Sequence, residues 1–257
     1  MGLMQKYQLK KATRLIAVSK ATKIDLVKKL GIKTKKINVV YEGYDKNLFQ
    51  VVKSDQLQNV LKDYDIEPYR YFLFVGTVQP RKNLERLIRA FNLLKLARSA
   101  SLDSPNATLD QLKLAIVGKK GWLADEIYAL PKKLGIESRV KFLDYVKKED
   151  LPALYSGAIG LIFPSLFEGF GLPILEAQAC GCPVLTSNVS SMPEVAGKGG
   201  ILVNPYSIDD IVKGMEKCQM SNVKSQMIKA GFENVKRFSW ENCAKETLKV
   251  LEEVVNE

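Results

Sequence analysis

Two glutamates, Glu168 and Glu176, stand eight positions apart on either side of a glycine-rich turn. Carboxylates accept hydrogen bonds from vicinal hydroxyls, so Glu176 could hold a ribose and Glu168 a second sugar attached to a diphosphate. A pair of carboxylates can also serve as acid and nucleophile in the hydrolysis of a glycoside. The plainest alternative is that Glu168 only complements a helix dipole and that Glu176 is a solvated helix residue.

The segment around these glutamates predicts a strand, a turn and a helix. The apolar run 159–164 has the length of a buried strand, and Gly169 and Gly171 can adopt backbone angles that other residues avoid. Pro173 suits the first helical position, which predicts a helix over residues 173–180. The free N–H groups and the positive dipole end of such a helix favour a negative group such as a diphosphate.

Two adjacent cations, Arg81 and Lys82, form a second candidate cluster. They follow a predicted strand at 71–75 and precede a predicted helix at 84–98, with Asn83 as its N-cap. Positive charge at the start of a helix costs up to about 1 kcal/mol, and a bound diphosphate would reverse the sign. Arginine offers a planar fork to two phosphate oxygens, while lysine supplies a point charge. The alternative is two exposed basic residues in a loop of a basic protein.

The sequence around both clusters resembles a known family. Residues 167–177 read Phe-Glu-Gly-Phe-Gly-Leu-Pro-Ile-Leu-Glu-Ala, and related motifs occupy 181–187, 192–197 and 75–83. This pattern is similar to the donor site of family 4 (group 1) retaining glycosyltransferases, in particular of mannosyltransferase-like members. The resemblance covers nearly the whole chain but only the C-terminal part of a typical member. It implies a GT-B fold and the transfer of a hexose from a nucleotide-diphosphate sugar to a glycan or lipid-linked acceptor in polysaccharide biosynthesis.

The resemblance also implies roles for individual residues. Glu168 would orient the transferred sugar while Arg81 and Lys82 stabilise the leaving phosphate, and these three are the predicted catalytic residues. No metal or other cofactor is implied. The motif that contains Arg81 and Lys82 leans toward GDP-mannose as donor and leaves a UDP-sugar as a nearly equal alternative. Tyr145 and Val146 would lie against the nucleotide base, unless they are only packing residues. The complete predicted nucleotide-sugar site is Gly76, Thr77, Arg81, Lys82, Gly118, Tyr145, Val146, Glu168, Gly169, Phe170, Gly171, Leu172 and Glu176.

The sequence departs from the family pattern in two ways. Many members carry an arginine where Thr77 stands, so phosphate binding would rest on Arg81 and Lys82. The N-terminal domain of a typical member carries the acceptor site and often a histidine near the donor sugar, and neither is found in this sequence. Two hypotheses therefore stand. The chain is a glycosyltransferase, or it is an inactive or partner-dependent donor-binding subunit whose acceptor domain is supplied by another chain.

The composition narrows the function classes. The 257 residues carry a net charge of +11, include no histidine and hold four cysteines. Without histidine, zinc sites that use histidine ligands and histidine-based acid/base chemistry are excluded within this chain. The positive charge indicates an anionic partner, but no basic run with interleaved aromatics points to nucleic acid. We expect a cytoplasmic protein with reduced cysteines, and peripheral association at the inner face of the membrane is left open.

Strands and helices alternate along most of the chain. This alternation predicts an α/β fold, namely a Rossmann-like, doubly wound parallel sheet. Ligand sites in such a sheet lie beyond the carboxyl ends of the strands, where the loops 76–83, 118–121, 144–146 and 168–172 would converge. The strands predicted for this sheet are 71–75, 112–117, 140–143, 159–164, 184–187 and 200–203.

The order of elements predicts four segments. Residues 1–45 resemble a remnant of the N-terminal, acceptor-side domain, and residues 46–67 an interdomain linker region with one helix. Residues 68–239 form the predicted donor-binding domain, and residues 240–257 a helix that crosses back onto the N-terminal side. The polar stretch 97–111 predicts a surface loop.

Overall fold

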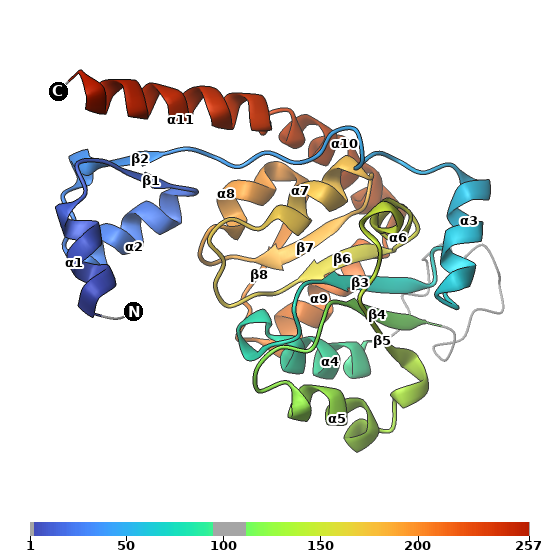
Figure 1. Cartoon of the computed structure of the whole chain (residues 1–257). Helices are drawn as coiled ribbons and strands as arrows, with labels where there is room; N and C mark the ends of the chain where they lie inside the picture. Colours follow the sequence, from blue (N-terminus) through green and yellow to red (C-terminus); the bar gives the residue numbers. More distant parts are fainter. Residues whose placement is uncertain (1–2, 95–111, 257) are drawn as a thin grey trace.

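The computed structural model describes residues 3–94 and 112–256, and within them the central element is a sheet of six parallel strands (Figure 1). The strand order is β5-β4-β3-β6-β7-β8. The inner strands are buried along their length because helices cover both faces of the sheet. The predicted parallel α/β sheet is therefore confirmed. Its strands are β3 (Tyr71–Val75), β4 (Lys113–Val117), β5 (Val140–Asp144), β6 (Gly160–Phe163), β7 (Val184–Ser187) and β8 (Gly200–Val203).

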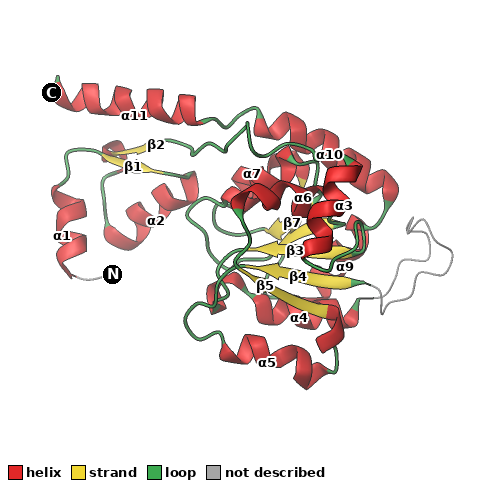
Figure 2. Cartoon of the chain, turned by 45° about the vertical axis from the view of Figure 1, so that its right-hand side comes forward, coloured by secondary structure: helices red, strands yellow, loops and turns green. Residues whose placement is uncertain are grey.

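Helices pack on the sheet in two layers (Figure 2). The order of the strands reverses between β3 and β6. From β3 the sheet continues through β4 to β5 on one side, and from β6 it continues through β7 to β8 on the other side. Such a switch point leaves a crevice at the carboxyl ends of the two strands. One layer contains α4 (Leu84–Leu93), α5 (Asp125–Leu134) and α9 (Ile208–Cys218), and the other contains α6 (Leu151–Ser156), α7 (Leu172–Ala179), α8 (Met192–Ala196) and α10 (Ser221–Val235).

A small N-terminal unit lies beside the sheet domain (Figure 1). It has a core of its own, built from the buried side chains of Ala17, Ile32 and Ile37. A long C-terminal helix, α11 (Trp240–Val255), returns from the sheet domain and runs next to this unit in both views (Figures 1 and 2). The unit consists of α1 (Leu3–Lys11), β1 (Leu15–Ala17), α2 (Lys20–Leu30) and β2 (Ile37–Val39), and β1 and β2 pair in parallel.

Two chain crossings join the unit to the sheet domain. A Cβ atom on Gly43 would lie only 2.2 Å from the backbone nitrogen of Trp240, so the two crossing segments pass in direct backbone contact. Beyond the crossing, α3 (Ser54–Asp63) buries Leu57 and Leu61 in the core of the sheet domain. The domain boundaries predicted at residues 45, 67 and 239 stay a prediction. No helix among the described residues is both long and apolar enough to cross a membrane.

The helix predicted over 84–98 is shorter than expected. It ends at Leu93 because the backbone of Leu94 is extended. The stretch 95–98 and the whole of the predicted surface loop 97–111 lie outside the described residues. Asn83 takes the predicted N-cap position, but its side chain makes no capping hydrogen bond to the helix. Its backbone is left-handed (φ 62°), and its amide nitrogen donates to two distant carbonyls, those of Pro164 (3.0 Å) and Pro205 (2.7 Å).

Candidate functional site

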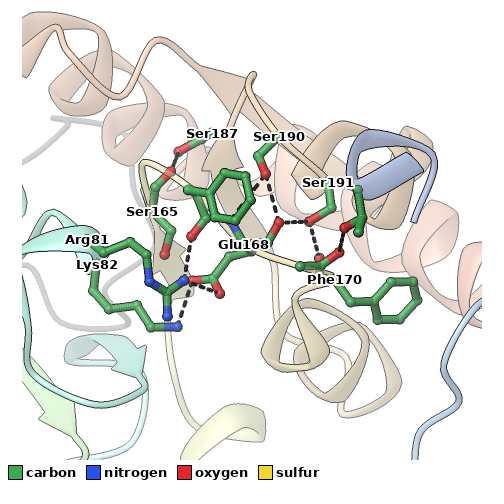
Figure 3. Close-up of polar contacts among 11 residues, drawn as sticks. Arg81, Lys82, Ser165, Glu168, Phe170, Ser187, Ser190 and Ser191 are labelled. Atoms are coloured by element: carbon green, nitrogen blue, oxygen red, sulfur yellow. Dashed lines mark hydrogen bonds and ion pairs between the residues drawn. The ribbon is translucent and has the colours of Figure 1, made fainter. Parts of the chain in front are cut away.

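The Glu168 carboxylate lies between the two predicted cations (Figure 3). One carboxylate oxygen is 2.6 Å from Nζ of Lys82, and the other is 2.8 Å from Nη1 of Arg81. The side chains of Lys82 and Glu168 are each 10% exposed, whereas that of Arg81 is 38% exposed. Two cations and one carboxylate leave a net positive charge in a largely buried cluster. Such a cluster attracts an anion.

The strand switch point brings this cluster together. Arg81 and Lys82 lie in the tight turn that follows β3, and Glu168 follows β6, the strand that pairs with β3 on the opposite side from β4. A backbone hydrogen bond from the N–H of Leu166 to the carbonyl of Arg81 (2.9 Å) ties the two loops. Arg81 Nη1 also donates to the carbonyl of Phe167. The three predicted catalytic residues therefore meet in the crevice where α/β sheets of this kind bind ligands.

Lys82 is held in an unusual environment for a lysine. Burial lowers its pKa below the ordinary value of 10.5, although the neighbouring Glu168 carboxylate acts in the opposite direction. Its ammonium group lies 4.9 Å from the centre of the Phe163 ring, at the end of β6. A Cβ atom on Gly76 would lie 3.4 Å from the same ammonium group, so Lys82 passes directly over this glycine. Neighbouring groups thus enclose the Lys82 side chain on several sides and hold it in one position.

Serine side chains fix the loop that carries Glu168 (Figure 3). The Ser190 hydroxyl donates to the carbonyl of Glu168 (2.8 Å) and accepts from its N–H (3.2 Å). The Ser191 hydroxyl lies 2.6 Å from the carbonyl of Phe170 and 3.1 Å from that of Glu168. Ser187 bonds the carbonyl of Ser165 (2.6 Å), while the buried hydroxyl of Ser165 itself is without a partner among the described residues. The loop conformation is therefore imposed by hydrogen bonds from the segment after β7.

Two glycines bring the loops after β3 and β4 into contact. Gly76 (φ 148°) and Gly118 (φ 143°) both adopt backbone angles that favour glycine. A Cβ atom on Gly118 would lie 2.1 Å from the carbonyl oxygen of Gly76, so no larger residue fits there. Close packing of the two loops therefore requires a glycine at position 118, and both glycines also line a cavity.

That cavity has a volume of about 220 Å³ and lies beyond the carboxyl ends of β3, β4 and β5. The Tyr145 side chain is 68% exposed, and the ammonium group of Lys119 lies 5.3 Å from the centre of its ring. Val146 is 6% exposed and belongs to the core. Asp144 also lines the cavity, and its carboxylate accepts a hydrogen bond from the Tyr128 hydroxyl (3.2 Å). Five predicted residues thus line one cavity, namely Gly76, Thr77, Gly118, Tyr145 and Val146.

Glu176 is neither solvated nor joined to the other candidates by a direct contact among the described residues. It lies in α7, and its carboxylate accepts a hydrogen bond of 2.8 Å from the buried hydroxyl of Tyr155 in α6. Burial raises the pKa of Glu176 above its ordinary value of 4.5, although the Tyr155 hydroxyl and the charge of Lys148 act in the opposite direction. Leu151, one turn before Tyr155 in α6, lines the 220 Å³ cavity. Glu176 itself is not among the residues that line this cavity and is connected to it only through α6.

The remaining predicted residues belong to the start of α7. Gly171 takes the N-cap position with φ 116°, and it has no side chain that could cap the helix, which begins at Leu172. Gly169 lies against the N-terminal unit, since its carbonyl accepts from the Thr22 hydroxyl (3.2 Å). The Phe170 side chain is turned away from the cluster and packs against the ring of Tyr41 with the centroids 5.9 Å apart. Phe170 can therefore contribute only backbone groups to the site.

Glu194 joins the N-terminal unit to the site. Its two carboxylate oxygens each accept a 3.0 Å hydrogen bond from a backbone N–H at the start of α2, those of Lys20 and Ala21. The hydroxyl of Tyr41 donates to the same carboxylate (3.1 Å). A carboxylate satisfies the free N–H groups of a helix start and complements its dipole. The sequence prediction did not assign this role, although Glu194 lies in the 192–197 motif.

The sequence prediction also missed the supporting residues Ser165, Ser190, Ser191 and Tyr155. Single hydroxyl residues carry no local pattern that distinguishes a hydrogen bond to a functional loop from exposure to solvent. The one available signal was proximity, because Ser165 stands three positions before Glu168 and the two other serines directly precede the 192–197 motif.

The comparisons with known proteins agree with this geometry. Residues 58–233 match the family described as Glycosyl transferases group 1, and the chain belongs to this family. O-antigen chain mannosyltransferase B of Escherichia coli is 38% identical over 190 residues, which are 74% of this chain and 47% of that protein. The serotype-specific mannosyltransferase WbdA of Escherichia coli is 30% identical over 92% of this chain and 28% of its own length. The chain thus spans half or less of these curated relatives.

A solved structure confirms the fold. The crystal structure of Anabaena HepE in complex with UDP and glucose superposes with a TM-score of 0.83 at 21% identity, over 97% of this chain and 66% of that chain. At this level of identity the likeness establishes the fold alone. The predicted membership of the group 1 glycosyltransferases and the resemblance to mannosyltransferase-like members are therefore confirmed, while the role of each site residue stays a proposal.

Proposed function

We propose that this chain binds the donor of a retaining hexosyltransferase, which moves mannose from GDP-mannose to a glycan or lipid-linked acceptor in polysaccharide biosynthesis. The observation that carries this proposal is the Arg81–Glu168–Lys82 cluster beside the 220 Å³ cavity at the strand switch point. The cluster offers positive charge for a diphosphate, and the cavity offers space for a base. The mannosyltransferase relatives support the choice of sugar.

In the proposed reaction the bond between the anomeric carbon and the diphosphate oxygen breaks, and its electron pair stays on the diphosphate. The anomeric carbon forms its new bond to the oxygen of an acceptor hydroxyl, whose proton passes to the departing diphosphate. The new negative charge would be stabilised by Arg81 and Lys82 and by the uncapped start of α7. Lys82 is already fixed by its surroundings, so little reorganisation is needed when charge develops. We propose that this set of groups works without a metal ion or another cofactor.

Glu168 then has two tasks. Without a donor, its carboxylate compensates the buried charge of Lys82 and part of that of Arg81. When a diphosphate takes over that compensation, the carboxylate becomes free to accept hydrogen bonds from hydroxyls of the transferred sugar. A glycosidase is disfavoured because both carboxylates are already engaged, that of Glu168 by the two cations and that of Glu176 by the Tyr155 hydroxyl.

The cavity lining supports GDP rather than UDP. The carboxylate of Asp144 can accept two hydrogen bonds from the adjacent N–H groups on the edge of guanine, whereas uracil presents a single N–H between two carbonyls. The exposed ring of Tyr145 offers a stacking surface for the base. Glu176, which is connected to the cavity lining through Tyr155 and α6, would bind the ribose. A UDP-sugar is the competing donor, because the structure of the similar protein HepE contains UDP.

We also propose an acceptor and a location for the reaction. The acceptor would be a glycan or a lipid-linked saccharide, and the reaction would take place in the cytoplasm or at the inner face of the membrane. Acceptor groups are supplied by residues beyond the donor site, either in the same protein or in a partner chain, because the relatives named above are longer than this chain.

Donor turnover tests the proposal. The chain is incubated with GDP-mannose or UDP-glucose in a chelator, with and without membrane extract as a source of acceptors, and the released nucleotide is measured by chromatography. We expect release of GDP that requires the extract and is lost in Lys82→Ala, while Lys132→Ala on α5 behaves like the wild type. Binding of GDP without release would instead assign the function of a donor-binding subunit. Neither binding nor release of either nucleotide would contradict the proposal.

A further inference from the structure

The net charge of the chain is concentrated at its N-terminal end. Residues 1–36 contain eleven Lys and Arg and a single acidic residue, Asp25. Ten of the eleven net positive charges therefore lie in this stretch, and residues 37–257 together carry a net charge of only +1. The donor cluster at Arg81 and Lys82 does not account for this distribution, since it belongs to the nearly neutral part.

Many of these cations are free to meet a partner. Three of them stabilise the unit itself: Lys23 bonds the carbonyl of Ile37, Lys36 that of Ala12, and Arg14 that of Lys35. Lys29 forms an ion pair with Asp25, the one such pair within the described part of this stretch. The other described lysines are exposed and have no carboxylate within ion-pair distance among the described residues; they are Lys10, Lys11, Lys20, Lys28, Lys33 and Lys35.

Exposed apolar side chains lie among these lysines. Ile24 is 50% exposed in the middle of α2, and Lys20 and Lys28 stand one helical turn before and after it. Tyr7 is 58% exposed in α1, with the ammonium group of Lys11 lying 4.7 Å from the centre of its ring. This combination of lysines and exposed apolar groups is typical of segments that lie on a lipid surface.

The distribution of the charge identifies the class of partner. The exposed lysines of the basic stretch belong to α1, to α2 and to the segment 33–35, so the charge is spread over several elements instead of converging on a small anion. A single exposed tyrosine and an aliphatic side chain do not form a stacking platform for nucleic acid bases. A broad anionic surface with an apolar layer beneath it matches both the lysines and Ile24.

We propose that the N-terminal unit is a membrane-docking surface that binds anionic lipid head groups, with Ile24 and Tyr7 entering the boundary of the acyl layer. The unit adjoins the donor site, because Lys29 lies 5.5 Å from the ring of Phe167, the neighbour of Glu168. Docking through this unit places the donor site at the lipid surface. That this position serves to reach a lipid-linked acceptor rests on the proposed function. Lipid binding itself does not depend on the proposed function.

Vesicle sedimentation tests the proposal. The chain is mixed with phosphatidylcholine vesicles that contain about 30% phosphatidylglycerol, and with vesicles of phosphatidylcholine alone. We expect binding to the anionic vesicles only, and its loss at about 0.5 M salt, where exposed charges are screened. The triple variant Lys28→Gln, Lys33→Gln, Lys35→Gln should reduce the partition coefficient on the order of a hundredfold, about fivefold for each lysine. Ile24→Ser should reduce it about fivefold.

The control variant removes the same charge from exposed positions in the sheet domain, through Lys132→Gln, Lys213→Gln and Lys217→Gln. It should sediment like the wild type. Equal losses in the two triple variants would mean that net charge alone matters and would overturn the proposal. If the chain bound single-stranded polyuridylate more tightly than anionic vesicles, that result would overturn the choice of partner. Titration of the same variants with GDP tests the donor site separately from lipid binding. These substitutions leave Arg81, Lys82 and Glu168 in place, so loss of lipid binding and loss of nucleotide binding can be told apart.

Discussion

The carboxylate of Glu168 lies 2.6 Å from the ammonium group of Lys82, and both side chains are 10% exposed. The two residues are 86 positions apart in the chain and come from the loops after β3 and β6. Removing one member of a buried pair leaves the other charge without compensation, which costs more than the pair contributes when intact. The contact therefore couples the stability of the sheet domain to the chemistry of its candidate site.

A double-mutant cycle measures this coupling. Lys82→Ala and Glu168→Ala should each lower the free energy of unfolding by about 1–3 kcal/mol, because each leaves a buried charge behind. The double variant should lose less than the sum of the two, by about 1 kcal/mol or more. Urea denaturation provides the values. The exposed pair Lys133 and Glu126 is the control, with an expected coupling below about 0.5 kcal/mol. Additive losses at Lys82 and Glu168 would contradict the contact.

Glu176 should make stability depend on pH. Its pKa is raised in the folded chain by burial, so over the interval between 4.5 and the raised value the folded state binds more protons than the unfolded state. The stability contributed by this group is therefore complete below pH 4.5 and is lost as the pH rises through the raised pKa. The difference in melting temperature between the wild type and Glu176→Gln should change in this direction across a pH series. A difference that is constant with pH would show that Glu176 titrates as it does in solvent.

Gly118→Ala should destabilise the chain strongly. The new Cβ atom would lie 2.1 Å from the carbonyl oxygen of Gly76, at a backbone angle that alanine rarely adopts. We expect a loss of at least about 3 kcal/mol, since backbone strain and a steric overlap combine. Gly135→Ala is the matched control, because that glycine also has a positive φ but no atom within 4 Å of its Cβ position. It should cost about 1 kcal/mol. Equal losses would mean that backbone angle alone matters at Gly118.

Glu194→Ala should loosen the start of α2. The substitution leaves the N–H groups of Lys20 and Ala21 without their carboxylate, and the loss of such a cap costs about 1 kcal/mol. Hydrogen exchange of these amides should accelerate about fivefold, while amides of the central strands keep their rates. Glu233→Ala, which removes an exposed carboxylate of α10, is the control. Unchanged exchange in α2 would show that Glu194 does not hold the N-terminal unit.

Much of the sheet domain was predictable from the sequence. The strands 71–75, 184–187 and 200–203 appear with the predicted bounds, because apolar runs bounded by glycine, proline or polar residues carry a strong local signal. The helix predicted over 240–257 is found over Trp240–Val255. The convergence of the loops followed from one rule, that the carboxyl ends of parallel strands share one edge.

The details of the site depend on contacts that no local pattern contains. The bond between Lys82 and Glu168 exists because β3 and β6 pair, and the strand order cannot be inferred from either segment alone. Asn83 has the residue type and position of an N-cap, but two distant carbonyls compete for its side chain. The Phe170 ring lies in the predicted site motif, yet its packing against Tyr41 turns it away. In each case a long-range contact overrides a local preference.

The most direct test of the donor site is calorimetric titration of GDP into the wild type, Lys82→Ala and Glu168→Gln without added metal. We predict that Lys82→Ala binds GDP about tenfold to a hundredfold more weakly, because a charge-assisted contact contributes about 1.5–3 kcal/mol. Glu168→Gln should bind GDP at least as tightly as the wild type, because it keeps the shape of the cluster and removes the charge that competes with the diphosphate for Arg81 and Lys82. Equal affinity in all three proteins would contradict the assignment of this cluster to the diphosphate.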